Sequence, residues 1–379
     1  MDLGKLIDLY EENFIKYGEL GASVCIIQDG QSVLNIGRGF IDPTRTKQWN
    51  SATRVLIWSA TKALASACLL HCCERSGIVL RRRVSDFWPE YAVNGKEDTT
   101  LSHILSHQSG QAALRQLDIS IFDHEAVVQA LAAQQPFWRP GEAHGYHART
   151  YGFLVDEVVR RMSSGLTVAE YFRQVFGGPL DLDLWIGVPA ALVNDVAPIQ
   201  TPRKKRESSF EDPFYEALAD KNSLTWQAFA TPTGPIAPSA FNAPEIRMHA
   251  LPSLGGIGTA ESLARFYYRV FCEPEFLSRD LLSSLTKTSV SGQDRVLQIP
   301  TAFSLGFMKD PISAEQRKLR KIFGPSLAAF GQPGAGGSHA FVDPEWKLAF
   351  AYVMNQMEQG VLPNQKSLRL VNQLYADHI

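Results

Sequence analysis

Ser59 and Lys62 are the two residues of this chain whose types and spacing best suit covalent chemistry. They stand three positions apart, where the apolar run 55–58 leads into residues with helical spacing. On a helix they would share one face, about one turn apart. A cation beside a serine hydroxyl at a helix start stabilises the alkoxide, because the helix dipole also favours negative charge there. This S-x-x-K spacing predicts a serine nucleophile that is acylated and then releases the acyl group.

The same four-residue pattern occurs a second time, from Ser284 to Lys287. Thr288 and Ser289 follow, so this copy also imitates the K-T-G element of acyl-serine enzymes. It lies in a polar stretch, 281–291, that we predict to be the tail of a helix. We therefore interpret Ser284 as part of a solvated helix end, and the surroundings of each copy must identify the nucleophile.

The composition is that of an ordinary globular enzyme, with 45% hydrophobic and 20% charged residues among 379. A formal charge of -2 gives no reason to expect a nucleic-acid or membrane partner. No run of about 18 apolar residues could span a bilayer, and the first residues resemble an amphipathic helix rather than an export signal. The five cysteines lack the spacing of a disulfide framework, which favours reduced thiols and a cytoplasmic location.

Two groups of residues have a spacing that is reminiscent of metal sites. One is a cysteine-rich helical stretch around Cys72, and the other is the pair His103 and His107, four positions apart. The first lacks the paired spacing of zinc ligands, and Ile104 stands where a metalloprotease helix would carry Glu. We expect helix-packing cysteines, structural histidines and no metal.

Hydrophobic periodicity predicts an α+β protein. The turn residues Asp29-Gly30 join two strand-like runs, as in a β-hairpin. The predicted helices cover 3–17, 59–77, 154–162, 260–271 and 367–379, and the predicted strands cover 22–28, 32–36, 338–342 and 347–355.

Both ends of the chain combine helix and strand, whereas the middle is mostly helical. This predicts an α/β sandwich in which an antiparallel sheet is flanked by N- and C-terminal helices, with a helical region inserted. We expect a discontinuous sheet domain of residues 1–80 and 250–379, and an inserted domain of residues 81–249. Periodicity fades over 201–252, where aromatic residues accumulate. This segment, up to about residue 249, is either a lid over the substrate or a surface insertion with one amphipathic helix.

Six stretches, in order over residues 18–355, resemble the class C β-lactamase-like serine hydrolases. This family includes penicillin-binding proteins and family VIII carboxylesterases, and the carboxylesterase branch is the one most resembled. The resemblance implies the β-lactamase/transpeptidase-like fold. The stretches are GELGAS at 18–23, WSATK at 58–62, FWPE at 87–90, LSHQSG at 105–110, HGYHA at 144–148 and FGQPGAGG at 330–337.

The resemblance implies a role for each catalytic element. Ser59 would be the nucleophile, and Lys62 would hold the alkoxide and relay its proton. Tyr146 matches the tyrosine of the family's Y-x-N element, the general base for acylation and the acid for the leaving group. Because a phenol has an ordinary pKa of about 10, it needs a cation such as Lys62 nearby to act as a base near neutrality. The backbone N–H groups of Ser59 and Ala335 would form the oxyanion hole.

Two departures from the family pattern bear on the substrate. Ala148 replaces the asparagine of Y-x-N, and Gln332 replaces the cation of the K-T-G-like element. Gln332 offers an amide donor without charge, which weakens recognition of an anionic substrate and favours a neutral ester, thioester or amide carrier. The predicted substrate contacts are Gln332, Pro333, Gly334, His144, His147 and Trp226.

Two activities share this chemistry. One is hydrolysis of a small neutral ester through acyl-Ser59, and the other is transfer of the same acyl group to an alcohol or amine, as in natural-product biosynthesis. The missing cation argues against a β-lactamase or D-Ala-D-Ala peptidase. The intact Ser59, Lys62 and Tyr146 argue against a catalytically silent scaffold. We expect no cofactor, and the only partners expected are a small acyl donor and, for transfer, its acceptor.

Overall fold

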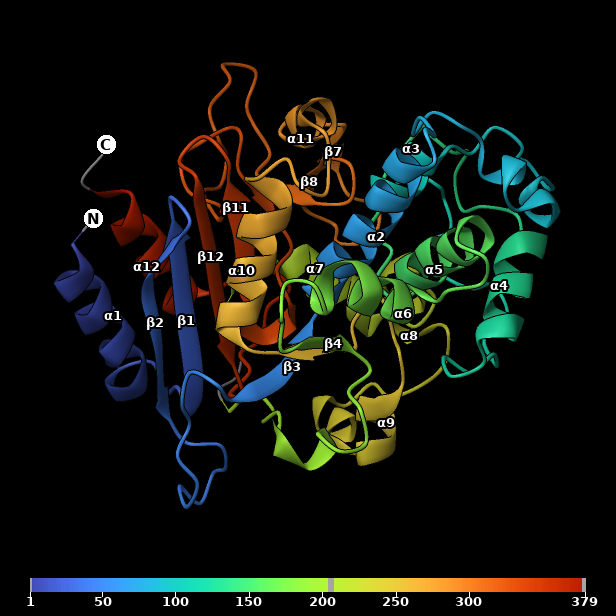
Figure 1. Cartoon of the computed structure of the whole chain (residues 1–379). Helices are drawn as coiled ribbons and strands as arrows, with labels where there is room; N and C mark the ends of the chain where they lie inside the picture. Colours follow the sequence, from blue (N-terminus) through green and yellow to red (C-terminus); the bar gives the residue numbers. More distant parts are fainter. Residues whose placement is uncertain (1, 204–207, 377–379) are drawn as a thin grey trace.

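An eight-stranded antiparallel sheet forms one side of the molecule in the computed structural model, which describes residues 2–203 and 208–376 (Figure 1). In the order in which they pair, its strands are β2 (Gln31–Gly39), β1 (Gly21–Gln28), β12 (Leu348–Met354), β11 (His339–Asp343), β10 (Phe330–Gly331), β9 (Met308–Lys309), β8 (Pro300–Phe303) and β7 (Val290–Gln293).

The first and last strands of the chain are neighbours in this sheet. Ala22 of β1 lies opposite Met354 of β12, and the register continues along the length of β1. β1 and β2 are joined by Asp29 and Gly30, whose φ angles of 48° and 79° are the left-handed values that a tight hairpin turn requires. The predicted hairpin is therefore confirmed.

Helices cover both faces of the large sheet. α1 (Leu3–Ile15) and α12 (Gln365–Leu374) pack together on one face, and α10 (Ala260–Phe271) crosses β1, β11 and β12 on the other (Figure 1). Tyr10 of α1 meets Tyr352 of β12 edge to face, with ring centres 6.4 Å apart. The predicted antiparallel sheet flanked by N- and C-terminal helices is confirmed, and both of these helices lie on the same face.

A smaller sheet and most of the remaining helices form the other side of the molecule (Figure 1). The strands of this sheet, in pairing order, are β4 (Leu184–Ile186), β6 (Gly256–Gly258), β3 (Arg54–Trp58) and β5 (Val196–Ala197). The helices are α2 (Thr61–Arg75), α3 (Leu101–Leu105), α4 (His124–Ala133), α5 (Thr150–Met162), α6 (Val168–Phe172), α7 (Asp212–Ala219), α8 (Leu224–Ala230), α9 (Pro244–Met248) and α11 (Arg279–Leu285).

α2 is the central helix of the molecule. Nearly all of its residues are buried, including the small side chains of Ala63, Ala65 and Ala67. Because this helix is buried on nearly all sides, its start is held in place by the elements packed around it.

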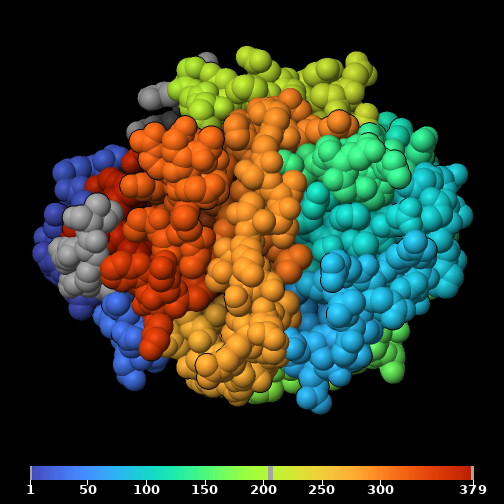
Figure 2. All heavy atoms as spheres, turned by 90° about the horizontal axis from the view of Figure 1, so that it is seen from above, coloured from blue at the N-terminus to red at the C-terminus, as the bar shows by residue number. Residues whose placement is uncertain are grey.

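The segment that carries α11 and β7 crosses the upper face of the molecule. Its gold-to-orange atoms form a band between the cyan and green helical region and the red-orange C-terminal part (Figure 2). The prediction of one helix tail over 281–291 was wrong, because α11 ends at Leu285 and β7 begins at Val290 to pair with β8.

In its described residues, segment 201–252 contains three short α-helices, α7, α8 and α9, rather than one. Its residues 204–207 lie outside the described residues, as do residues 377–379 of the predicted closing helix. The domain boundaries at 80/81 and 249/250 stay a prediction. No helix within residues 2–203 and 208–376 is both long and apolar enough to cross a membrane.

Candidate active site

Ser59 lies in the tight turn that joins β3 to α2. Trp58 has a left-handed φ of 52°, and Ala60 N–H donates to Ile57 O at 3.2 Å, which closes the turn. The N–H of Lys62 then donates to Ser59 O at 3.0 Å at the start of the helix. The half-buried Ser59 side chain therefore stands just before the N-terminus of a long buried helix, as the motif predicted.

The amine of Lys62 is buried against three oxygen atoms. Its Nζ donates to the carbonyl oxygens of Ala148 and Ser253, each at 2.9 Å, and lies 3.3 Å from Ser59 Oγ. Burial lowers the pKa of Lys62 well below its ordinary value. A neutral amine has two N–H groups and one lone pair. The two carbonyls take both N–H groups, which leaves the lone pair for the Ser59 hydroxyl.

Ser253 is itself fixed by two further hydrogen bonds. Its hydroxyl donates to Arg149 O at 2.7 Å and accepts from Gly152 N–H at 2.6 Å. The carbonyl that holds Lys62 is therefore tied to the first turn of α5, next to the loop that carries Tyr146.

Tyr146 completes the cluster from the loop before α5. Its ring centre lies 4.8 Å from Lys62 Nζ, and its hydroxyl accepts a hydrogen bond from Gln332 Nε2 at 3.2 Å. Burial raises the pKa of Tyr146, and hydrogen bonds with Ser59 and Gln332 offset only part of that effect. Near neutrality Tyr146 is thus a phenol with a proton to give.

The Gly-rich stretch after β10 approaches the nucleophile turn closely. A Cβ on Gly334 would lie 2.3 Å from Ile57 O, so only glycine lets the two backbones meet here. Within residues 2–203 and 208–376, the N–H groups of Ser59 and Ala335 donate to no protein acceptor. Two free N–H groups on adjoining backbones are what an oxyanion hole requires.

A profile of the Beta-lactamase family matches residues 6–373 of the chain. The chain belongs to the β-lactamase family. It is 30% identical over 346 residues to the esterase/beta-lactamase LipL of Mycobacterium tuberculosis, an alignment that covers 89% of this chain and 77% of LipL. The family that the six stretches predicted is confirmed.

Two solved structures are similar to this β-lactamase-family chain over 98% of its length and 96% of theirs. One is a penicillin-binding protein homolog from Caulobacter crescentus, with 30% identity and a TM-score of 0.86. The other is a family VIII carboxylesterase, with 28% identity and a TM-score of 0.86. The chain is thus an enzyme, a serine hydrolase or acyltransferase of the β-lactamase family.

His144 and His147, which flank Tyr146 in this β-lactamase-family enzyme, have partners within the protein. The ring of His147 lies between Gly145 O at 2.6 Å and Ser109 Oγ at 2.8 Å, and burial lowers its pKa to about 3. His144 Nε2 lies 2.9 Å from Thr301 Oγ1. These contacts hold the tyrosine loop, and a direct contact of either ring with substrate stays a prediction.

His107 is a neighbour of Tyr146 that the sequence reasoning treated only as structural. Its ring centre lies 5.0 Å from that of Tyr146, and its Nδ1 accepts from His147 N–H at 3.1 Å. His107 has a left-handed φ of 60°, just past the end of α3, so it does not share a helix face with His103. The LSHQSG stretch, which contains His107, is the part of the sequence that could have indicated a place near the active site.

Of the aromatic residues in 201–252, Phe241 reaches the nucleophile turn. Its ring centre lies 4.8 Å from that of Trp58, next to Ser59. Trp226 is half-buried in α8, and no hydrogen bond or ring contact of the described residues joins it to Ser59, Lys62 or Tyr146. Its contact with substrate stays a prediction.

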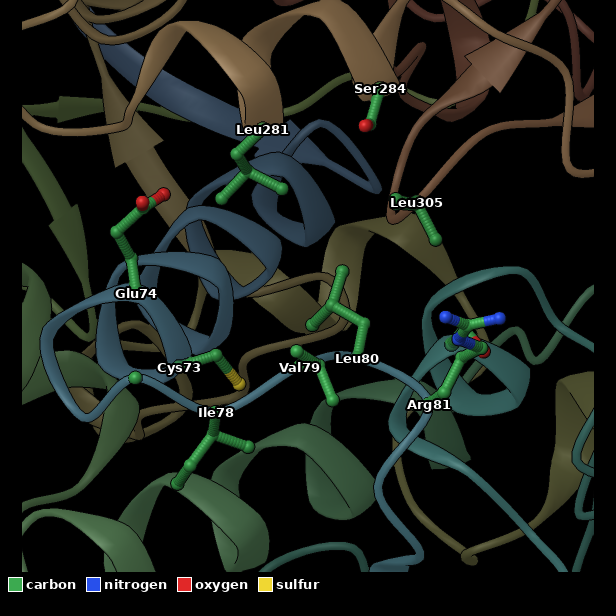
Figure 3. Close-up of a pocket in the computed structure, with 11 residues that line it drawn as sticks. Cys73, Glu74, Ile78, Val79, Leu80, Arg81, Leu281, Ser284 and Leu305 are labelled. Atoms are coloured by element: carbon green, nitrogen blue, oxygen red, sulfur yellow. The ribbon is translucent and has the colours of Figure 1, made fainter.

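The second S-x-x-K copy lies elsewhere in this β-lactamase-family fold. Ser284 of α11 lines an open, mainly apolar pocket of about 510 Å³ together with Leu281, Leu305 and residues 77–81 (Figure 3). Its hydroxyl donates to Asp280 O at 2.9 Å, and the Lys287 side chain is exposed. Among the described residues no amine is hydrogen-bonded to Ser284, in keeping with its interpretation as part of a solvated helix end.

The two groups with metal-like spacing have other contacts. His71 Nδ1 lies 2.9 Å from the hydroxyl of Tyr171, and Cys68 Sγ lies 3.7 Å from Val168 O. His103 caps the start of α3 by accepting from Thr100 N–H. Among the described residues, no three His, Cys, Asp or Glu side chains are arranged to hold a metal ion.

Proposed function

We propose that this enzyme hydrolyses a small neutral ester, as a carboxylesterase does, through an acyl-Ser59 intermediate. The observation that carries the proposal is the placement of Lys62 Nζ, 3.3 Å from Ser59 Oγ and with both N–H groups bound to carbonyls. The similarity to LipL, an esterase/beta-lactamase, and to a family VIII carboxylesterase supports the esterase half of this assignment.

In acylation, Lys62 accepts the proton of Ser59 as Oγ attacks the ester carbonyl carbon. The N–H groups of Ser59 and Ala335 stabilise the oxyanion. Tyr146 gives its proton to the departing alkoxide and recovers one from Lys62. In deacylation a water molecule follows the same route, and Ser59 regains its proton. The pKa directions thus favour Lys62 as the base, whereas the family resemblance gave that role to Tyr146.

Gln332, which stands where the family pattern has the cation of the K-T-G-like element, favours a neutral substrate. Gln332 is 1% exposed and contributes an amide rather than a charge beside Tyr146. A carboxylate placed there would lose its water without gaining a cation, which disfavours β-lactams relative to neutral esters.

Acyl transfer is the second candidate, favoured by one contact. Phe241 packs against Trp58 beside the nucleophile, which brings part of segment 201–252 next to the turn, where exclusion of water would favour transfer. If the segment also holds an alcohol or amine, the acyl group passes to that acceptor, as in natural-product biosynthesis.

One experiment separates these readings. The protein is mixed with p-nitrophenyl butyrate, quenched early and analysed by intact mass and peptide mapping. A butyryl adduct on Ser59 that decays in buffer supports the esterase, and one that persists until an alcohol or amine is added supports transfer. Ser59→Ala should abolish the adduct and nitrophenol release, and Ser284→Ala, from the second motif, should retain both. Full ester cleavage by Ser59→Ala would overturn the proposal.

A further inference from the structure

We propose that Asp294 is a positioning residue for Tyr146, acting through the backbone of the tyrosine loop. The inference rests on the proposed function, since it concerns the acid that protonates the leaving group. Asp294 lies directly after β7, far from Tyr146 in the sequence, and its side chain is fully buried.

The carboxylate of Asp294 binds the tyrosine loop and its own loop together. Its Oδ1 accepts from the backbone N–H groups of Tyr146 at 3.0 Å, Val296 at 2.8 Å and Leu297 at 2.8 Å. Hydrogen bonds from N–H groups to a buried carboxylate are among the stronger ones in proteins. Removal of the carboxylate would leave all three N–H groups buried without a partner.

A second pair of contacts clamps the residue two positions before Tyr146. Arg295 N–H donates to His144 O at 3.1 Å. The hydroxyl of Thr301 donates to Asp294 Oδ2 at 3.0 Å and lies 2.9 Å from His144 Nε2. The stretch 294–301, the Asp294 loop, therefore holds the tyrosine loop at both His144 and Tyr146.

The Asp294 loop also contacts the segment proposed to cover the substrate. Thr225 of α8 donates its hydroxyl hydrogen to Val296 O at 2.7 Å. The position of Tyr146 is thus set by a loop that packs against segment 201–252, and neither Asp294 nor Thr225 needs to touch the substrate.

The consequence for catalysis depends on the leaving group. A nitrophenolate leaves readily without a proton, whereas an alkoxide needs the proton of Tyr146. If Asp294 places the phenol, its loss slows cleavage of an alkyl ester far more than cleavage of a nitrophenyl ester with the same acyl group. A defect that only loosened the fold would lower both rates in proportion to the active fraction.

The test compares kcat/KM for ethyl butyrate and p-nitrophenyl butyrate. For Asp294→Ala we expect a loss of about 100-fold on the ethyl ester and under about 10-fold on the nitrophenyl ester. Asp294→Asn should recover most of the rate, because its Oδ1 can still accept the three N–H groups. Thr301→Val should lower kcat/KM for the ethyl ester relative to the nitrophenyl ester by a smaller factor. This second variant allows the test to be made even if Asp294→Ala does not fold.

Asp310 provides the matched control. It is also a buried aspartate that accepts two backbone N–H groups, from Ile322 at 3.0 Å and Phe323 at 3.2 Å, in another loop. Asp310→Ala should lower stability and leave the ratio of the two esters unchanged. Equal losses on both esters for Asp294→Ala and Thr301→Val would overturn the positioning role.

A readout that does not need turnover separates this inference from the proposed function. With 3-fluorotyrosine at position 146, Asp294→Ala should shift or broaden the ¹⁹F signal, and Asp310→Ala should not. If the wild-type enzyme cleaves neither ester, the proposed function fails while this signal still tests the placement of Tyr146. An unchanged signal in Asp294→Ala would refute it.

Discussion

Lys62 Nζ donates a hydrogen bond to the carbonyl oxygen of Ala148, at the position where the family pattern has asparagine. The backbone, rather than a side chain, holds the lysine from this direction. Since every residue has a carbonyl, the loss of the asparagine does not release Lys62. The departure from the family pattern at Ala148 is thus compatible with an intact lysine site.

Replacement of Lys62 by methionine should abolish ester cleavage and leave the fold intact. We expect a loss of about 10³-fold or more in kcat/KM, because Lys62 is the group proposed to take the Ser59 proton and methionine cannot accept it. Methionine removes the cost of burying an amine, which stabilises the fold, but it leaves two carbonyls without a hydrogen-bond donor, which destabilises it. Because these effects oppose each other, the free energy of unfolding should change by no more than about 2 kcal/mol. Nitrophenol release and thermal unfolding measure the two effects.

Lys309 is the control for this substitution. It is also a buried lysine bound to carbonyls, those of Thr286 at 2.7 Å and Leu327 at 2.8 Å, and burial lowers its pKa to about 8. Lys309→Met should resemble Lys62→Met in stability and retain wild-type activity. A similar loss of activity in both variants would mean that Lys62 acts only through the fold.

The pH dependence of kcat/KM should report Lys62 and Tyr146 separately. Lys62 must be neutral to accept a proton, so activity should rise with pH and reach half its maximum well below the ordinary lysine pKa. The raised pKa of Tyr146 keeps its proton in place, so no loss of activity is expected up to about pH 10. Measurement of kcat/KM between pH 5 and 10 tests both the rise of activity and the absence of a fall at high pH. A rise centred at the ordinary lysine pKa would contradict a neutral Lys62.

The same lowered pKa of Lys62 affects stability. The unfolded chain binds a proton at this amine over a pH range in which the folded protein does not. This contribution to stability therefore increases as pH rises from the folded pKa of Lys62 toward its ordinary value.

Gln332→Lys should change the preference between neutral and anionic substrates. A cation beside Tyr146 would attract a carboxylate, so the ratio of kcat/KM for a cephalosporin to that for p-nitrophenyl butyrate should rise about 10-fold or more. Hydrolysis of both substrates measures the ratio. Gln373→Lys, another buried glutamine but on α12, should destabilise the protein without changing this ratio. An unchanged ratio in Gln332→Lys would remove Gln332 as the determinant of substrate charge.

Gly334→Ala should impair catalysis by moving the backbone that carries the Ala335 N–H. The added Cβ would meet Ile57 O at 2.3 Å, so the two segments must separate. We expect kcat to fall by about 100-fold and stability by about 1–3 kcal/mol. Gly4→Ala on α1 is the control, since among the described residues its Cβ would meet only Asp2 Oδ1 at 3.4 Å, and it should be neutral or stabilising. Wild-type kcat in Gly334→Ala would argue against this oxyanion hole.

The fold and the centre of the site were largely predictable because they depend on side-chain types. The β1–β2 hairpin follows from its turn residues, and Ser59, Lys62 and Tyr146 from their motifs. Ser253 was not predictable, because it acts through a carbonyl that every residue has. Asp294 was missed because it binds an amide distant in sequence, and nothing in the surrounding residues marks that contact.

Segment 201–252 was the least predictable part of the chain. Its helices α7, α8 and α9 are short, and α9 has no buried residue, so hydrophobic periodicity is weak there. Phe241 contacts Trp58 through tertiary packing, which the spacing of residues in the sequence does not predict. Trp226 was predicted as a substrate contact only because it is a tryptophan.

The hydrogen bonds of Ser253 separate two tasks that the chain must perform. Its carbonyl binds Lys62, and its hydroxyl is hydrogen-bonded to the start of α5. The chain directly after segment 201–252 is therefore held in place. Changes before Ser253 that spare Thr225 and its hydrogen bond to the Asp294 loop should therefore leave the site of proton transfer undisturbed. Apart from that contact, the described part of segment 201–252 can vary with the substrate while the residues that transfer the proton stay in place.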